Sequence, residues 1–193
     1  MRKLIDFIKS INSGTPQFRI AESSDASSPI YPYYNQSDLQ DDLSGIISEG
    51  IERKTVRTED EVCTLNLGDV IFSLISGTAS IVQRERQGYL YTQNYVRLVP
   101  NKHVDSRYLV YLLNEDDGIR RQWAAGLQGS MVIKYTIGQL KKLTVPQLPD
   151  LQKQKTIGKI YLLQLHLEAL KKRAAERETL LRLSTLKEIH RNE

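Results

Sequence analysis

The chain contains one cysteine, Cys63, among its 193 residues, so it cannot form an internal disulfide. A single cysteine is typical of a protein from a reducing compartment. Residues 1–7 are too few and too polar for a signal peptide, and no run approaches the roughly 18 apolar residues of a membrane span. These absences predict a soluble, cytoplasmic protein.

The usual sequence signatures of catalysis are also missing. There is no glycine-rich loop for a nucleotide or for S-adenosylmethionine, and no Asn/Asp-Pro-Pro-aromatic tetrapeptide of an amino-methyltransferase. The three histidines lack metal-ligand spacing with Cys63. Asp38, Asp41 and Asp42 with Glu52 and Lys54 mimic the scattered acids and lysine of a metal-dependent nuclease, but such acids lie at strand ends and these flanks are loop-like. We therefore expect a non-catalytic chain with no cofactor and no metal.

The positive charge is unevenly distributed. Residues 151–193 contain 10 basic and 5 acidic residues, whereas residues 1–150 contain 17 basic and 18 acidic ones. The excess of +4 for the whole chain therefore comes from the C-terminal segment. Any nucleic-acid surface on the first 150 residues must be local.

A boundary lies near residue 149. Pro146 and Pro149 end the preceding structure, because proline donates no backbone hydrogen bond and biases its predecessor away from helical geometry. Asp150 can cap a new helix. After it, only Gly158 interrupts a helical pattern that continues to Glu193. We predict a globule over residues 1–149 and one long helix over residues 150–193.

The globule has the pattern of an α+β domain. β-Branched and aromatic runs bounded by glycine, asparagine and proline predict strands, and Asp105 is the expected cap of an amphipathic helix. A second amphipathic segment follows around Trp123, which we assign to the core. Strands followed by helices favour a curled, mostly antiparallel sheet. Residues 22–45 are expected to form long loops. The predicted strands are residues 62–65, 69–75, 79–82, 89–92 and 95–99.

The terminal helix carries an apolar stripe with the 3-4 spacing of a coiled coil. Its members are Ile160, Leu163, Leu167, Leu170, Ala174 and Leu181, with Arg177 as the one polar member. A single helix cannot bury such a stripe by itself, so a partner is required. The lysines and arginines of this segment either form a solvated face or contact a phosphate or a partner.

Several segments, taken in order, resemble the specificity (S) subunits of type I restriction-modification systems. They are residues 67–73, 77–79, 92–97, 105–113, 129–130 and 136–143, followed by the Val145-Pro146 to Gln154 boundary and Ile157-Gly158-Lys159-Ile160. The resemblance implies a DNA-reading target recognition domain followed by the helix of the conserved spacer region. Family members usually carry two such units, whereas this chain has one. It therefore looks like a half-subunit, or else a truncated cassette.

The resemblance also implies partners. A half-subunit would form a homodimer through antiparallel helices, and two identical readers would recognise a split, palindromic target in double-stranded DNA. The helix would dock methyltransferase (M) subunits and, through them, the restriction (R) subunit, which supply S-adenosylmethionine, ATP and Mg²⁺. A non-catalytic coiled-coil adaptor whose globule binds a protein stays open as the alternative.

The predicted DNA contacts combine basic side chains that neutralise phosphates with polar and aromatic side chains that read base edges. The loop around Tyr31 could equally be a lid over the core, and residues 83–87, a predicted hairpin tip, could be a plain solvated turn. The glycine turn before Thr78 and the Gln93-Asn94 pair could serve the fold alone. The candidates are Tyr31, Tyr33, Lys54, Arg57, Thr78, Arg84, Arg86, Gln93, Asn94, Ser130 and Lys134.

Overall fold

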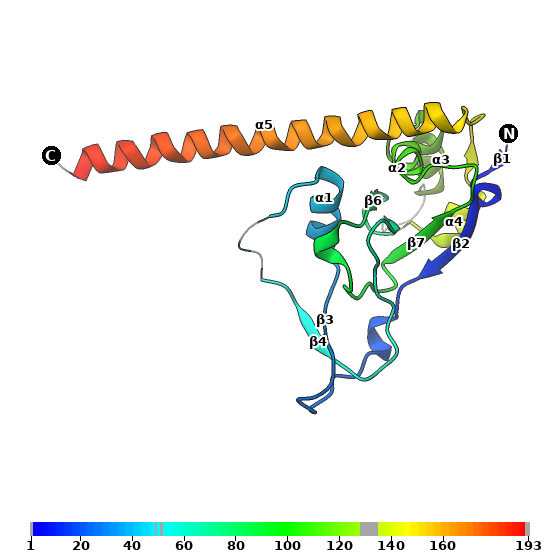
Figure 1. Ribbon diagram of the computed structural model, residues 1–193, viewed down its shortest axis with the longest axis horizontal. Coiled ribbons are helices and arrows are strands. Elements are labelled where there is room, and N and C mark those ends of the chain that lie inside the picture. Colours follow the sequence, from blue (N-terminus) through cyan, green and yellow to red (C-terminus); the bar gives the residue numbers. More distant parts are fainter. Residues whose placement is uncertain (1, 49, 51, 128–134, 192–193) are drawn as a thin grey trace.

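The structure is a computed structural model that describes residues 2–48, 50, 52–127 and 135–191. Its elements, in chain order, are β1 (Arg2–Lys3), η1 (Leu4–Phe7), β2 (Ile8–Ser13), η2 (Gln17–Arg19), β3 (Ile30–Pro32), α1 (Gln36–Ser44), β4 (Thr55–Arg57), β5 (Val70–Ser73), β6 (Ala79–Ile81), η3 (Arg84–Arg86), β7 (Tyr95–Pro100), α2 (Ser106–Glu115), α3 (Asp117–Leu127), α4 (Ile137–Lys142), β8 (Thr144–Val145) and α5 (Leu151–Arg191). Figure 1 shows α5 lying along one side of the other elements.

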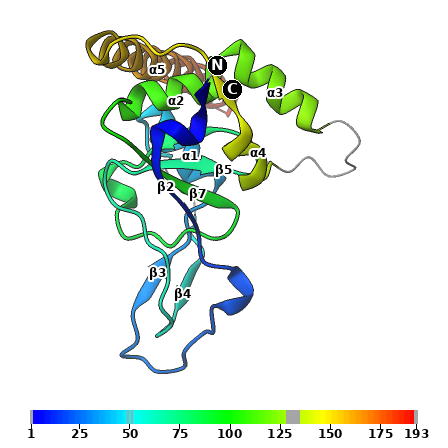
Figure 2. The ribbon, with the colours of Figure 1, turned by 90° about the vertical axis from the view of Figure 1, so that its right-hand side faces the viewer.

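The central sheet has four strands in the order β2-β7-β5-β6, and every pairing is antiparallel. Two short antiparallel pairs, β1-β8 and β3-β4, lie outside it. The α+β class and the antiparallel pairing are confirmed, whereas the predicted curl of the sheet stays a prediction. Figure 2 shows β3 and β4 at the end of the molecule opposite α5.

The sheet separates two apolar clusters because side chains alternate along a strand. On β5, Val70 and Phe72 belong to the larger cluster with α2 and α3, and Ile71 belongs to a smaller cluster with Leu39 of α1. Trp123 stacks on Phe72 at 5.5 Å between ring centroids, which confirms its predicted place in the core.

Three predicted features of the globule were wrong. Residues 62–65 and 89–92 form only isolated bridges, because the backbone around Leu90 divides its bonds between the two segments next to it, at Tyr33 and at Thr64. The expected loop at residues 22–45 contains α1. There, Asn35 accepts a hydrogen bond from the backbone of Asp38, whose carboxylate accepts one from the backbone of Asn35, a reciprocal cap that starts the helix.

The predicted long C-terminal helix is confirmed, and it begins at Leu151. The Asp150 carboxylate accepts a hydrogen bond of 2.9 Å from the backbone N–H of Lys153. The helix then runs for 41 residues, about 60 Å at 1.5 Å per residue, and its C-terminal part extends beyond the globule (Figure 1). In the part of the chain that the structure describes, no helix is long and apolar enough to cross a membrane.

One buried amide joins α5 to the globule. The Gln154 side chain is 2% exposed. Its oxygen accepts a bond from the backbone N–H of Asp105, the residue that caps α2, and its amide nitrogen donates to the carbonyl oxygens of His103 and Pro149. One turn later, a Cβ on Gly158 would lie 2.5 Å from the backbone nitrogen of Tyr108, so only glycine permits this approach of α5 to α2.

We predict that Gln154→Ala lowers the free energy of unfolding by about 2–3 kcal/mol, because it leaves three partly buried backbone groups without this partner. Chemical denaturation of the full chain measures this. Gln152→Ala, a matched change on the exposed side of the same helix, should stay within about 0.5 kcal/mol of the native protein. Equal losses in the two variants would contradict the role of Gln154.

Candidate nucleic-acid interface

Four of the predicted DNA contacts come together on the small β3-β4 sheet. Tyr31 pairs with Val56 across the two strands, and the backbone N–H of Tyr33 donates to the carbonyl of Lys54. Tyr31 and Tyr33 are half-buried, and the exposed Lys54 ammonium lies 5.5 Å from the centre of the Tyr33 ring. Burial raises the pKa of Tyr33, so its phenol stays a neutral hydrogen-bond donor. This sheet therefore presents an aromatic and cationic surface.

Arg57, the fourth member, is engaged within this sheet. Its guanidinium donates to the carbonyl oxygens of Ala26 and Ser28 and so holds the preceding loop against β4. The side chains at the far end of this region are acidic and exposed, and phosphates are repelled there. They are Glu22, Asp25, Glu59, Asp60 and Glu61. The cationic surface of the β3-β4 region is therefore on its Tyr33-Lys54 side.

The segment at residues 83–87 differs from the predicted hairpin tip. It forms the 3-10 turn η3, and its two arginines point to different environments. Arg84 is exposed, whereas Arg86 is 1% exposed and its guanidinium contacts the carboxylates of Asp38 and Asp41. The prediction that Arg86 extends from a tip towards a groove is wrong. Arg86 instead fixes η3 to α1, and Arg84 is the side chain that η3 presents.

The three carboxylates that mimicked a nuclease site form the other half of this buried cluster. Asp38, Asp41 and Asp42 lie on the inner side of α1, and the half-exposed Arg53 approaches Asp38 at 3.5 Å. Asp42 accepts hydrogen bonds from the Tyr34 hydroxyl and from the backbone N–H of Gln83. Burial raises the pKa of Asp42 to about 6, against those two bonds, which lower it. Its negative charge is therefore weakly held.

The remaining candidates are distributed over other parts of the globule. The side-chain oxygen of Gln93 accepts a 2.7 Å bond from the backbone of Gln17, and the Asn94 carbonyl accepts one from Leu74. Gly77, before Thr78, has φ +69°, and a Cβ there would lie 2.5 Å from the Tyr135 ring. This turn thus requires glycine for the fold. Ser130 and Lys134 lie outside the described residues.

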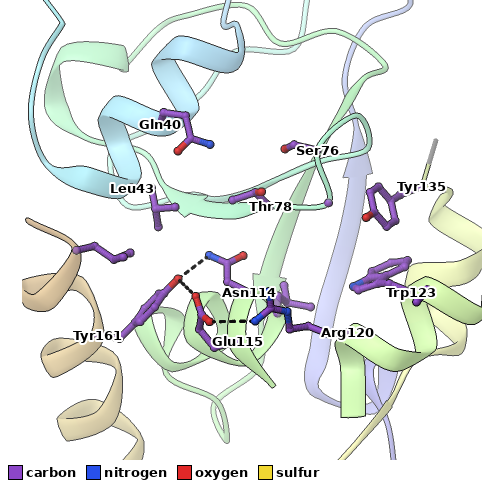
Figure 3. Close-up of a pocket in the computed structure, with 14 residues that line it drawn as sticks. Gln40, Leu43, Ser76, Thr78, Asn114, Glu115, Arg120, Trp123, Tyr135 and Tyr161 are labelled. Carbon is purple, nitrogen blue, oxygen red and sulfur yellow. Dashed lines mark hydrogen bonds and ion pairs between the residues drawn. The ribbon is translucent and has the colours of Figure 1, made fainter. Parts of the chain in front are cut away.

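A cavity of about 470 Å³ lies where the globule meets α5. Figure 3 shows Thr78 and Ser76 on one side of it, Trp123 and Tyr135 on another, and Tyr161 of α5 opposite them. Thr78 therefore faces the junction with α5 (Figure 3), whereas β3 and β4 lie at the opposite end of the molecule from α5 (Figure 2). The candidates do not form one continuous surface in the described chain.

Sequence reasoning missed the residues that hold these candidates in place. The order Asn35-Gln36-Ser37-Asp38 before Leu39 is a capping pattern that could have predicted α1 and, with it, the inner side that carries Asp38 and Asp42. No such signal exists for Tyr161, because its partners lie 46 and 47 residues away. Within the described residues, no group of three or more His, Cys, Asp or Glu side chains could hold a metal ion.

A family model described as the type I restriction modification DNA specificity domain matches residues 1–176. The chain belongs to this family. The membership confirms the resemblance noted in the sequence, and it confirms a recognition role in place of a catalytic one. The comparison with curated proteins gave no match.

Two solved structures share the fold of this specificity domain. One is the crystal structure of the HsdS subunit from Thermoanaerobacter tengcongensis, with 18% identity and a TM-score of 0.57 over 90% of this chain and 39% of that one. The other comes from work on the assembly and conformational transition of the type I R-M system, with 18% identity and a TM-score of 0.59 over 95% of this chain and 42% of that one. The chain thus spans about two-fifths of the length of both.

We predict that Asp42→Asn removes part of the pH dependence of stability. Because the folded state raises the pKa of Asp42 from 3.8 to about 6, it binds more protons than the unfolded state between those values, and stability falls as the pH rises through that window. The side-chain amide of asparagine has nearly the same shape but does not titrate, so the variant does not lose stability in this way. Its stability relative to the native protein should therefore improve by about 2 kcal/mol from pH 4 to pH 7. Denaturation at a series of pH values measures the difference, and two parallel profiles would contradict it.

Proposed function

We propose that this chain is the DNA-reading half-subunit of a type I restriction-modification complex and that two copies pair through α5. The observation that carries the proposal is the exposure of the predicted stripe. Five of its apolar side chains are between 45% and 67% exposed: Ile160, Leu163, Leu167, Leu170 and Leu181. Leaving so much aligned apolar surface in water is unfavourable, and a second helix covers it.

Opposite sides of α5 carry the contacts with the globule and the exposed stripe, which supports pairing through the stripe. At about 100° per residue, the side chains that pack on the globule, including Ile157, Tyr161 and Leu165, lie roughly opposite the stripe. The stripe therefore points away from its own globule and is free to meet a second copy. In an antiparallel pair, the stripe of one copy, from Ile160 to Leu181, packs against the same stripe of the other copy, which runs in the opposite direction. This arrangement keeps the two globules apart.

The position of the stripe gives a separation for the two readers. Its midpoint is near residue 170, and the segment that packs on the globule is centred near residue 160. In an antiparallel pair the two junctions are therefore separated by about 30 Å along the helix axes. This is close to one turn of B-DNA, about 34–36 Å, which is the spacing of half-sites for many twofold DNA-binding proteins.

The globule would read DNA through local surfaces, because its overall charge is near zero. Arg84 on η3 and Lys54 beside Tyr33 are exposed cations that can neutralise phosphates. Tyr31, Tyr33, Thr78, Gln93, Asn94, Ser130 and Lys134 stay proposed contacts. Arg86 is buried and is not a proposed DNA contact. Arg57 is proposed only to hold the preceding loop against β4.

The part of α5 beyond the globule offers a second surface. Leu183 is 49% exposed and lies on the side that packs on the globule earlier in the helix, where the antiparallel partner would not reach. A groove of about 650 Å³ adjoins it, with Ile46, Ala169 and Leu180 in its lining. We propose this surface for the methyltransferase subunit, through which the restriction subunit would join.

We predict that Leu163→Asp with Leu170→Asp converts the protein from a dimer to a monomer, because two charges in a helix seam oppose its burial. Sedimentation equilibrium at micromolar concentration measures the mass. Leu183→Asp is the matched control on the other side of α5 and should leave the dimer intact. A native protein that is already monomeric at that concentration overturns the two-reader proposal.

We predict that the native protein retains a duplex carrying its target and that the logarithm of the affinity falls linearly with the logarithm of salt concentration. Arg84→Ala with Lys54→Ala removes two cations from each of the two globules, so it should weaken binding by more than about tenfold at 0.1 M salt and reduce the salt slope by about four. Glu59→Gln with Glu61→Gln, on the acidic end of the β3-β4 region, is the control and should leave the slope unchanged. Salt-independent retention of DNA would instead favour the adaptor.

A further inference from the structure

The junction between α5 and the globule is a polar network as well as an apolar contact. The Tyr161 hydroxyl donates a 2.9 Å bond to Glu115 at the end of α2 and accepts a 3.3 Å bond from the amide of Asn114. Glu115 also pairs with Arg120 of α3 at 3.5 Å. Figure 3 shows these side chains converging beside the cavity. One hydroxyl of the helix therefore joins α5 to two helices of the globule.

The same network reaches the sheet. The Asn114 amide nitrogen donates to the carbonyl of Ala79, and its oxygen accepts from the backbone N–H of Ala79. Asn114 therefore binds the first residue of β6 in the way that a neighbouring strand would. Through it, the orientation of α5 is tied to β6 and to the turn that carries Thr78.

A second polar contact lies farther along α5. The Nδ1 atom of His166 is 2.9 Å from the carbonyl oxygen of Ser44, at the end of α1. Gly45, which follows with φ +66°, would place a Cβ 3.0 Å from that atom. Tyr161 and His166 are thus two directional contacts, five residues or about 8 Å apart along the helix. Two such contacts fix the angle between the helix and the globule, which apolar packing alone fixes less sharply.

We propose that Tyr161 and His166 are positioning residues that select the length of the spacer between the two half-sites of the target. The proposal rests on the proposed function, because it needs two globules joined by α5. A change in length of one base pair moves a half-site by about 3.4 Å. It also turns the half-site by roughly 35° about the DNA axis, and the two directional bonds resist the change in helix-globule angle that would be needed to follow it.

The test has two steps. The native dimer first selects bound duplexes from a randomised pool, which gives the half-sites and the preferred spacer. Binding is then compared, for each variant, between the preferred spacer and spacers one base pair longer and shorter. Tyr161→Phe keeps the aromatic packing and removes the hydroxyl. Tyr111→Phe is the matched control, because Tyr111 packs against the same ring at 5.5 Å without a part in the network. His166→Ala tests the second contact.

We expect Tyr161→Phe and His166→Ala each to reduce discrimination between spacers about fivefold, with affinity for the preferred spacer within about twofold of the native value. If these side chains only supported the fold, their loss would lower the affinity for every spacer length equally. Tyr111→Phe should change neither the discrimination between spacers nor the affinity for the preferred one. Unchanged discrimination in both variants, with a bipartite target selected by the native protein, overturns this inference and leaves the proposed function standing. Selection of an unsplit target overturns the proposed function and the inference with it.

Discussion

The close approach of α5 to α2 is the constraint on which the rest of the structure depends. Gly158 brings the two helices into backbone contact, and the buried Gln154 amide satisfies the groups at the start of α2 that this approach would otherwise leave without partners. With one side of α5 packed on the globule, the apolar stripe on the opposite side is exposed. The exposure of the stripe follows from this contact, and the proposed separation of two readers depends on it.

The buried Arg86 cluster plays a corresponding role inside the globule. A fully buried arginine is costly unless each of its charges and donors is paired, and Asp38 and Asp41 supply that pairing from α1. These ion pairs hold η3 against α1. Arg84 therefore extends from a turn that is fixed to α1. Burial raises the pKa of Asp42 to about 6, so the stability that this cluster contributes depends on pH.

Most elements of the fold could be predicted from short stretches of the sequence. The two prolines and Asp150 predicted the start of α5, Asp105 predicted α2, and alternating β-branched runs predicted β5, β6 and β7. The candidate contacts were harder, because burial depends on partners distant in sequence. Arg84 and Arg86 are two residues apart and equally basic, yet one is exposed and the other is enclosed by α1. Residues 62–65 and 89–92 have strand composition, but the backbone around Leu90 divides its bonds between two neighbouring segments and so forms only bridges.

The central claim is that the outward stripe of α5 joins two copies in an antiparallel, twofold pair. Spin labels on single cysteines introduced by Lys171→Cys or Glu188→Cys, with Cys63 replaced by serine, measure it through the distance between the two copies. The antiparallel pair predicts a short distance, under about 20 Å, at position 171 and a long one, about 50 Å, at position 188. Equal short distances at both positions, or no coupling between labels, would contradict it.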